Sequence, residues 1–234
     1  MEIRFKPSRS FLNALTALLK SFLLLLSLLI CTAFAGCKKK IDYLPYVSEL
    51  RSNILLAKEE NFSLRIYSVS KENPYIPDGI PHECNTRVEV YLTAPEGKEN
   101  CKVFFTVDGQ EYGGEMSYDA VKAEYFFSCT LDISKVETLP CRVEYGKENF
   151  TLNALTIKQA NTLNVQEILK ALQTAESELF TSLTDQYGFA GEIYIRLIYE
   201  ESPYYYVGII DRDGHINAFL LNAQTGKILA KRAS

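Results

Sequence analysis

Short strand-length segments separated by turn residues constrain the fold of this chain most. Between residues 53 and 157, seven stretches alternate polar and apolar side chains or run apolar: 53–57, 62–69, 87–92, 101–107, 124–131, 141–145 and 150–157. The strongest turn signal between them is Asp108-Gly109, because glycine takes a positive φ without strain. No helical period appears between residues 60 and 160. This pattern predicts a mostly β fold that begins with an antiparallel β-sandwich.

Residues 70–86 interrupt the strand pattern with three prolines and a glycine. Proline removes a backbone donor and glycine favours turns, so the segment is a poor helix or central strand. It is predicted to be a long ordered loop or an edge segment.

The periodicity changes at residue 164. Asn164 and Glu167 have the spacing of a capping box. Apolar residues then recur at helical spacing, namely Val165, Ile168, Leu169, Leu172, Leu179, Phe180 and Leu183. This predicts an amphipathic helix of about five turns that ends at Thr184. Four strands are expected after it, at 193–199, 204–210, 216–221 and 227–230. A helix followed by an antiparallel meander predicts a small α+β module.

The first 36 residues have the composition of an export signal. Residues 1–20 are mixed and basic, and residues 21–36, SFLLLLSLLICTAFAG, carry no charge. This run is shorter than the about 20 apolar residues that a membrane-spanning helix needs. A basic start, a short apolar run and small residues at its end predict a secretory signal.

The end of this run, Ala33-Phe34-Ala35-Gly36-Cys37, resembles the lipobox of bacterial lipoproteins. The resemblance implies that the Cys37 thiol receives a diacylglycerol and that a peptidase cuts between Gly36 and Cys37. Phe34 stands where leucine is commonest, which leaves open how the signal is cleaved. An uncleaved signal anchor and a secreted form are the alternatives. All three place the rest of the chain outside the cytoplasm, and the lipobox implies a lipid anchor on the cell membrane.

These patterns divide the chain into four predicted parts. They are a signal peptide at 1–36, a tether at 37–52, a sandwich at 53–160 and the α+β module at 161–234. The sandwich resembles an immunoglobulin-like module in its strand pattern only, because the chain has no Trp and lacks the cysteine spacing of antibody domains.

The segment YYYVGIIDRDGHINAFLLNAQTGKILAKR (204–232) resembles the PepSY family. The matching positions are Ala223, Thr225, Gly226 and Lys227. Asn222 replaces the usual aspartate. The resemblance covers about residues 163–232 and implies a helix packed on a short antiparallel sheet. It also implies regulation or inhibition of a protease, or local binding, without catalytic residues.

Four cysteines lie in the body of the chain, at Cys84, Cys101, Cys129 and Cys141. None has the C-x-x-C spacing of a metal or redox site. Both disulfides and buried free thiols are compatible with an extracytoplasmic location.

Few residues suggest catalysis or metal binding. Asp211-x-Asp213-Gly214 has the look of a calcium loop, but the twelfth position is Asn222 instead of a bidentate glutamate. A hairpin turn explains the Asp-Gly pair. His82 and His215, the two histidines, have no nucleophile or metalloprotease motif beside them. We therefore expect no enzyme activity, no catalytic residue, no metal and no cofactor.

Charge and aromatic residues bear on partners. Of the 25 basic and 29 acidic residues, four and one lie in residues 1–36, which leaves a net charge of −7 on the remainder. An acidic body makes nucleic acid an unexpected partner. In a strand, Tyr204 and Tyr206 share a face, either as a ligand platform or as core. Lys38–Lys40 beside the lipid either contact anionic headgroups or form a solvated tether.

The sequence therefore predicts a membrane-anchored extracytoplasmic lipoprotein with a non-enzymatic binding or envelope-support role. The alternative is a regulator or inhibitor of a secreted or membrane protease that acts through the PepSY-like module. The expected partners are the membrane, through the lipid on Cys37, and an envelope protein or a protease.

Overall fold

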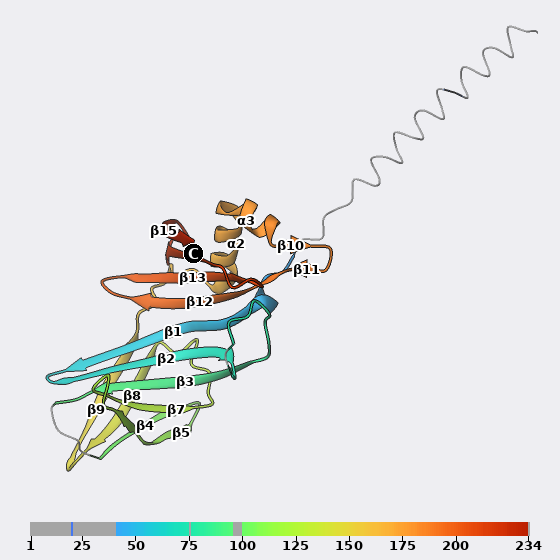
Figure 1. Ribbon diagram of the computed structural model, residues 1–234. Helices are drawn as coiled ribbons and strands as arrows, with labels where there is room; N and C mark the ends of the chain where they lie inside the picture. The colour runs from blue at the N-terminus through green and yellow to red at the C-terminus, as the bar shows by residue number, and fades with distance from the viewer. Residues whose placement is uncertain (1–19, 21–40, 75, 96–99, 234) are drawn as a thin grey trace, which may run out of the picture. The chain divides into compact units, whose positions relative to one another are not determined.

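A computed structural model describes residues 20, 41–74, 76–95 and 100–233 (Figure 1). The described chain from Asp42 onward forms one compact unit. The predicted signal peptide, apart from Lys20, and the sites Gly36 and Cys37 lie outside the described residues. None of the helices in the described part is long and apolar enough to cross a bilayer.

The fold is mostly β and mostly antiparallel, as the sequence predicts. The first part of the chain contains η1 (Leu44–Tyr46), β1 (Val47–Glu59), β2 (Phe62–Glu72), β3 (Cys84–Thr93), β4 (Cys101–Val107), β5 (Gln110–Glu115), β6 (Ser117–Asp119), β7 (Glu124–Cys129), β8 (Thr138–Tyr145) and β9 (Glu148–Thr156). The second part contains α2 (Val165–Ala175), α3 (Ser177–Ser182), β10 (Thr184–Asp185), β11 (Gly188–Phe189), β12 (Gly191–Tyr199), β13 (Pro203–Asp211), β14 (Ile216–Asn222) and β15 (Ile228–Ala233).

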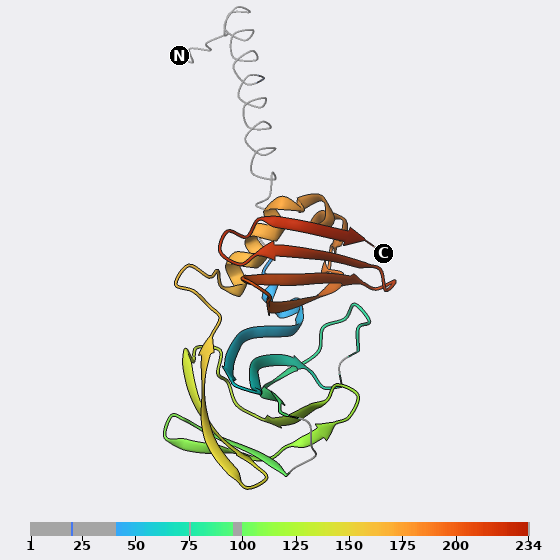
Figure 2. The ribbon, with the colours of Figure 1, turned by 90° about the vertical axis from the view of Figure 1, so that its left-hand side faces the viewer.

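Two β-layers form the first part, in a sandwich-like and partly closed arrangement (Figure 2). One layer has the order β1-β2-β3-β7-β6, and the other joins β9, β8, β4 and β5. β1 belongs to both, because Leu55 and Leu56 pair with β9. Alternate residues of each strand fill the space between the layers, as expected for half-buried strands. This core includes Leu55, Leu64, Ile66, Val88, Val90, Leu92, Val103, Phe105, Cys141, Val143, Leu152 and Ala154.

Three details differ from the predicted elements. β1 begins at Val47, inside the range 37–52 predicted as tether. β5 and β6 were not predicted, since QEYGGE lacks an apolar alternation; β5 forms because the Asp108-Gly109 turn folds it back onto β4. The loop between β2 and β3 is shorter than predicted and spans residues 73–83.

The helical segment begins where the sequence predicts. The Asn164 side chain accepts from the Glu167 N–H at 3.0 Å, and the Glu167 carboxylate accepts from the Asn164 N–H at 2.8 Å. The predicted single helix to Thr184 is wrong, because the chain breaks at Glu176 (φ −118°, ψ 41°) into α2 and α3. The two helices cover one face of the strands β12–β15 (Figures 1 and 2).

One parallel pairing joins the two parts of the chain. β1 pairs with β12 from Val47↔Ile193 to Arg51↔Arg196. The sheet is therefore continuous from β15 through β12 and β1 to β6. A register shift at Ser48 accompanies this pairing, and a second shift, at Ser52, lies in the pairing of β1 with β2. A β-bulge of this kind changes which face the following side chains occupy.

Candidate binding surface

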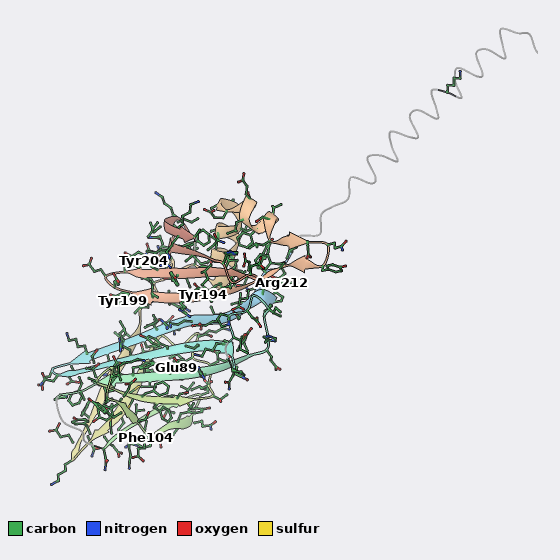
Figure 3. The ribbon with its side chains drawn as sticks, in the orientation of Figure 1. Glu89, Phe104, Tyr194, Tyr199, Tyr204 and Arg212 are labelled. Carbon is green, nitrogen blue, oxygen red and sulfur yellow. The ribbon has the colours of Figure 1, made fainter. Side chains whose placement is uncertain are left out.

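The continuous sheet has one face that lies opposite both cores, and we call it the outer face. Register shows which residues share it: Arg196 lies beside Arg51 and Tyr206, Tyr67 beside Glu89, and Tyr91 between Arg65 and Phe126. The outer face comprises Glu49, Arg51, Arg65, Tyr67, Arg87, Glu89, Tyr91, Glu124, Phe126, Tyr194, Arg196 and Tyr206. Figure 3 labels Glu89 on β3 and Tyr194 on β12, two strands that lie on opposite sides of β1 in the sheet.

Aromatic rings form two groups on the outer face. Tyr67 and Tyr91 have ring centroids 5.5 Å apart, and Tyr91 lies 5.1 Å from Phe126. On the other side of β1, the centroids of Tyr194 and Tyr206 are 5.8 Å apart. Tyr67, Tyr91 and Tyr206 are only half-buried. Such half-buried rings give a ligand large, rigid contact areas at low entropic cost.

Arginine side chains lie over these rings. The guanidinium of Arg51 is 4.3 Å from the centroid of Tyr67, that of Arg65 is 5.9 Å from Tyr91, and that of Arg196 is 4.9 Å from Tyr194. These distances are within the range of cation–π attraction. The arginines and aromatic rings therefore hold one another in place on the outer face.

Most of these arginines are also paired with carboxylates. Arg196 donates two hydrogen bonds to Glu49, at 2.7 and 2.6 Å. Arg87 donates to Glu89 at 2.9 Å, and Arg65 pairs with Glu124. Bidentate and partly buried pairs of this type fix side-chain orientation.

Arg51 differs from the other arginines of this surface. Its Nε is buried and has no hydrogen-bond partner, and among the described residues no carboxylate lies within ion-pair distance of it. The two nearby glutamates are engaged elsewhere: Glu49 by Arg196, and Glu89 by Arg87 and Tyr91. The positive charge of its guanidinium is therefore left for a ligand, and a carboxylate matches guanidinium donor geometry.

Tyr91 stays protonated beside Glu89. Burial and the neighbouring Glu89 carboxylate both raise the pKa of its hydroxyl above the ordinary value. The hydroxyl donates to Glu89 at 3.1 Å. The Tyr91 hydroxyl therefore acts as a hydrogen-bond donor that helps to hold the Glu89 carboxylate beside Arg87.

A pocket of about 330 Å³ opens at the end of the outer face where β6 meets β7. Its walls include Tyr91, Glu124 and Phe126 from the outer face, and it is completed by Ser117, Tyr118, Asp119 and Lys122. The volume is at the lower end of the range for small-molecule sites. Because it continues the row of rings on β3 and β7, we treat the pocket as part of the same surface.

The three tyrosines predicted from the sequence alternate between faces. Tyr206 lies on the outer face, half-buried and beside Tyr194. Tyr204 points to the same side and its hydroxyl accepts from Ser202 at 2.8 Å. Tyr205 is core: its hydroxyl donates to the Leu163 carbonyl at 2.8 Å, and burial with the nearby Glu167 raises its pKa to about 12.

The turn after β13 contains Asp211, Asp213 and Gly214 of the calcium-like pattern Asp211-x-Asp213-Gly214-x-x-Asn217. The Asp211 carboxylate accepts from the N–H groups of Asp213 and His215, each at 2.9 Å, and lies 3.1 Å from the His215 Nδ1. Burial acts to raise the pKa of Asp211, but the hydrogen bonds from His215 and Asp213 lower it overall. The three groups are close enough to hold an ion. Since the turn already uses the carboxylate of Asp211, a hairpin turn explains this arrangement.

The remaining candidates from the sequence do not converge on the outer face. His82 lies in the loop 73–83, 3.9 Å from the Asp78 carboxylate. The four body cysteines are free thiols. Cys101 and Cys141 are buried, and burial raises the pKa of each to about 12. Such thiols remain protonated and unreactive at neutral pH.

Sequence reasoning missed most of the outer face. Arg51, Tyr67 and Tyr91 belong to separate strands and carry no local motif. The alternation in β2 and β3 shows that Tyr67 and Tyr91 face away from the core, but it does not reveal that Arg51 lies beside them. That placement depends on the Ser52 bulge in β1.

Comparisons of this chain with protein-family models, with curated proteins and with solved structures gave no match.

Proposed function

We propose that this chain is a non-enzymatic, lipid-anchored extracytoplasmic protein that binds an anionic envelope ligand on its outer face. The observation that carries the binding part is Arg51, a cation stacked on Tyr67 whose buried Nε has no partner. The anchor part rests on Ala35-Gly36-Cys37 at the end of the uncharged run.

The physical basis of the proposed binding is desolvation of a charge. The Nε of Arg51 is buried, so a ligand would contact the rest of the half-buried guanidinium, whose charge has no carboxylate partner among the described residues. The Arg51 guanidinium lies over the Tyr67 ring, and the Tyr91 ring lies next to Tyr67. An anionic group between these rings gains both a charge-assisted hydrogen bond and apolar contact.

The pocket at β6 and β7 extends the proposed site. Lys122 lies in its lining and pairs with Asp119 at 3.9 Å. A ligand that reaches from Arg51 along Tyr91 into this pocket would cross β2 and β3. We therefore expect an extended ligand.

Regulation of a secreted or membrane protease through the PepSY-like module is the second candidate. It is favoured by the arrangement of α2 and α3 over β12–β15. The residues that carry the resemblance shape a turn: the Asn222 side chain accepts from the N–H groups of Gln224 and Thr225, at 3.0 Å each. Gly226 lies so close to the helix that an added Cβ would be 2.7 Å from Ala171. These contacts support the helix-on-sheet packing and assign no binding role to the matching residues.

The anchored protein, purified with its lipid, tests both parts. Intact-mass analysis is expected to find a diacylglycerol on an N-terminal Cys37; an unmodified residue 37 contradicts the anchor. Binding is then measured to isolated cell-wall polymer and to extracted envelope proteins. We expect Arg51→Gln to weaken binding at least tenfold and added salt to weaken it further, because the contact is electrostatic.

The matched control is Arg142→Gln. Arg142 stacks on Phe104 at 4.1 Å on the exterior of the other β-layer, so it repeats the arginine-on-ring geometry away from the outer face (Figure 3). Equal losses from both substitutions would contradict a site at Arg51. Capture of a protease that depends on 161–234 and not on Arg51 would favour the second candidate.

A further inference from the structure

The strand ends nearest the N-terminal tether lie together at one end of the sheet, which we call the anchor end. β1 begins there at Val47, opposite Ile193, and the pairing Gly191↔Asp211 closes β12 and β13 at the same end. β2 ends and β3 begins there as well, at Glu72↔Cys84. Figure 1 shows the loop between β2 and β3 and the β10–β11 hairpin at this end.

A buried carboxylate fixes the loop 73–83 onto the anchor end. Glu192 is fully buried and accepts from the Gly79 N–H at 3.0 Å and from the Ser48 hydroxyl at 2.9 Å. Gly79 has a φ of +77°, and an added Cβ would lie 2.6 Å from the Asp211 carbonyl oxygen. The loop backbone is therefore packed against both β12 and the turn after β13.

Two apolar side chains of this loop are exposed to solvent. Ile76 is 49% exposed and Ile80 is 48% exposed, on either side of the buried Gly79. Neither isoleucine contributes to the core. The hydrogen bond to Glu192 and the close packing of Gly79 hold this part of the loop against the sheet while both isoleucines are exposed.

The β10–β11 hairpin exposes a third large apolar side chain at the same end. The Asp185 carboxylate accepts from the N–H groups of Tyr187 and Gly188, at 2.7 and 3.1 Å, which fixes the turn. The base of the hairpin is attached to η1, because the Phe189 N–H donates to the Tyr46 hydroxyl at 3.3 Å. The Tyr187 ring at the tip is 86% exposed.

The tether brings this end to the membrane. Five residue steps separate Cys37 from Asp42, and an extended chain spans at most about 18 Å over that distance. The other end of β1, at Glu59, lies about 40 Å from Val47 by the rise of a strand. A lipid on Cys37 therefore limits the distance between Asp42, at the anchor end, and the bilayer to about 18 Å.

We propose that Ile76, Ile80 and Tyr187 insert into the interfacial region of the bilayer and orient the anchored protein. This rests on the proposed lipid anchor at Cys37. Aromatic side chains with a polar tip favour the membrane interface, and isoleucine gains by leaving water. The three side chains have acidic residues near them in the sequence, at Asp78, Glu83 and Asp185. The proposed contact is made by the three apolar groups, and salt does not screen an apolar contact.

The absence of tryptophan from the chain gives a direct test. Tyr187→Trp and Ile80→Trp each place a single tryptophan at the anchor end of the lipidated full chain. The control is Val121→Trp, because Val121 is 95% exposed and its turn lies beside Tyr125, which pairs with Leu92 at the far end. Each variant is reconstituted into phosphatidylcholine vesicles containing lipids brominated along their acyl chains.

For Tyr187→Trp and Ile80→Trp we expect strong quenching by bromine and a blue-shifted emission. Both signals are expected to be the same at low salt and at about 0.5 M salt, a concentration that screens surface charge. The Val121→Trp emission is expected to stay unquenched. Equal, low quenching at all three positions overturns the inference while leaving the anchor intact. If the protein fails to co-sediment with the vesicles, or if Cys37→Ser binds them equally well, the proposed anchor itself is wrong.

Discussion

Gly208 determines how the outer face packs on the C-terminal side of β1. The Tyr194 ring lies directly over this glycine, and an added Cβ would be 1.8 Å from a ring atom. The same ring lies beside Tyr206 and under the Arg196 guanidinium. Because Gly208 has no side chain, the Tyr194 ring can lie over the strand at this position. From there the ring contacts Tyr206 and Arg196.

Gly208→Ala is expected to displace the Tyr194 ring and to cost about 1–3 kcal/mol of unfolding free energy, the usual cost of overpacking. Urea denaturation followed by circular dichroism measures this change. In a Tyr194→Ala background the same substitution is expected to cost much less, because the clash is gone. An equal cost in both backgrounds would mean that the ring is not the reason for the glycine.

Hairpin turns are the elements that local chemistry specifies most fully in this chain. Gly109 and Gly214 have φ values of +80° and +82°, with nothing within 4 Å of an added Cβ, so their requirement is purely one of backbone conformation. In the turn after β13, Asp211 completes the structure by accepting hydrogen bonds from residues further along the turn. The carboxylate therefore contributes to stability through the turn itself.

Asp211→Asn is expected to change the unfolding free energy by less than about 0.5 kcal/mol, since an amide oxygen still accepts from the backbone. Asp211→Ala is expected to cost about 0.5–1.5 kcal/mol. Because the pKa of Asp211 is lowered by folding, its contribution is complete above about pH 4 and is lost as the pH falls through the lower folded value. Thermal melts at pH 7 and pH 3 measure this. Calcium that raised the midpoint of the wild type, and not of Asp211→Asn, would replace the turn by an ion site.

β1 makes residues 42–234 one structure. Its first half pairs with β12 and its second half with β9, while β2 lies along its whole length. The polar contacts at this junction are buried as well: Glu49 with Arg196, and Ser48 with Glu192. The predicted boundary between residues 160 and 161 lies in the segment between β9 and α2, away from this contact surface.

A chain limited to 41–158 is expected to give a β-type circular dichroism spectrum but to melt well below 41–234 and to aggregate more readily. Its β1 would expose the unpaired edge Val47–Arg51, and edges of this kind recruit other strands. The buried Glu49 would also lose its partner Arg196. Thermal melts and light scattering of the two chains measure the difference. Equal midpoints would show that the sandwich does not depend on β12.

Local sequence determined the parts of this fold whose cause is local. The Asp108-Gly109 turn, the Asn164–Glu167 capping box and the alternation of apolar residues in β2 and β3 are each specified within a few residues. Their hydrogen bonds and φ values need no distant partner. The approximate positions of β2, β3, β4 and β7 and the start of the helix were predictable for this reason, whereas β5, β6, β10 and β11 were not predicted.

Only the tertiary structure decided the parallel pairing of β1 with β12 and the surface that results from it. The two strands are separated by more than 130 residues, and no local pattern specifies which strand edges meet. The bulges at Ser48 and Ser52 reverse the alternation twice within β1, so the face that Arg51 occupies cannot be counted from its neighbours. Its neighbours Tyr67 and Arg196 come from different strands, because side chains on one sheet face are brought together by register and not by sequence.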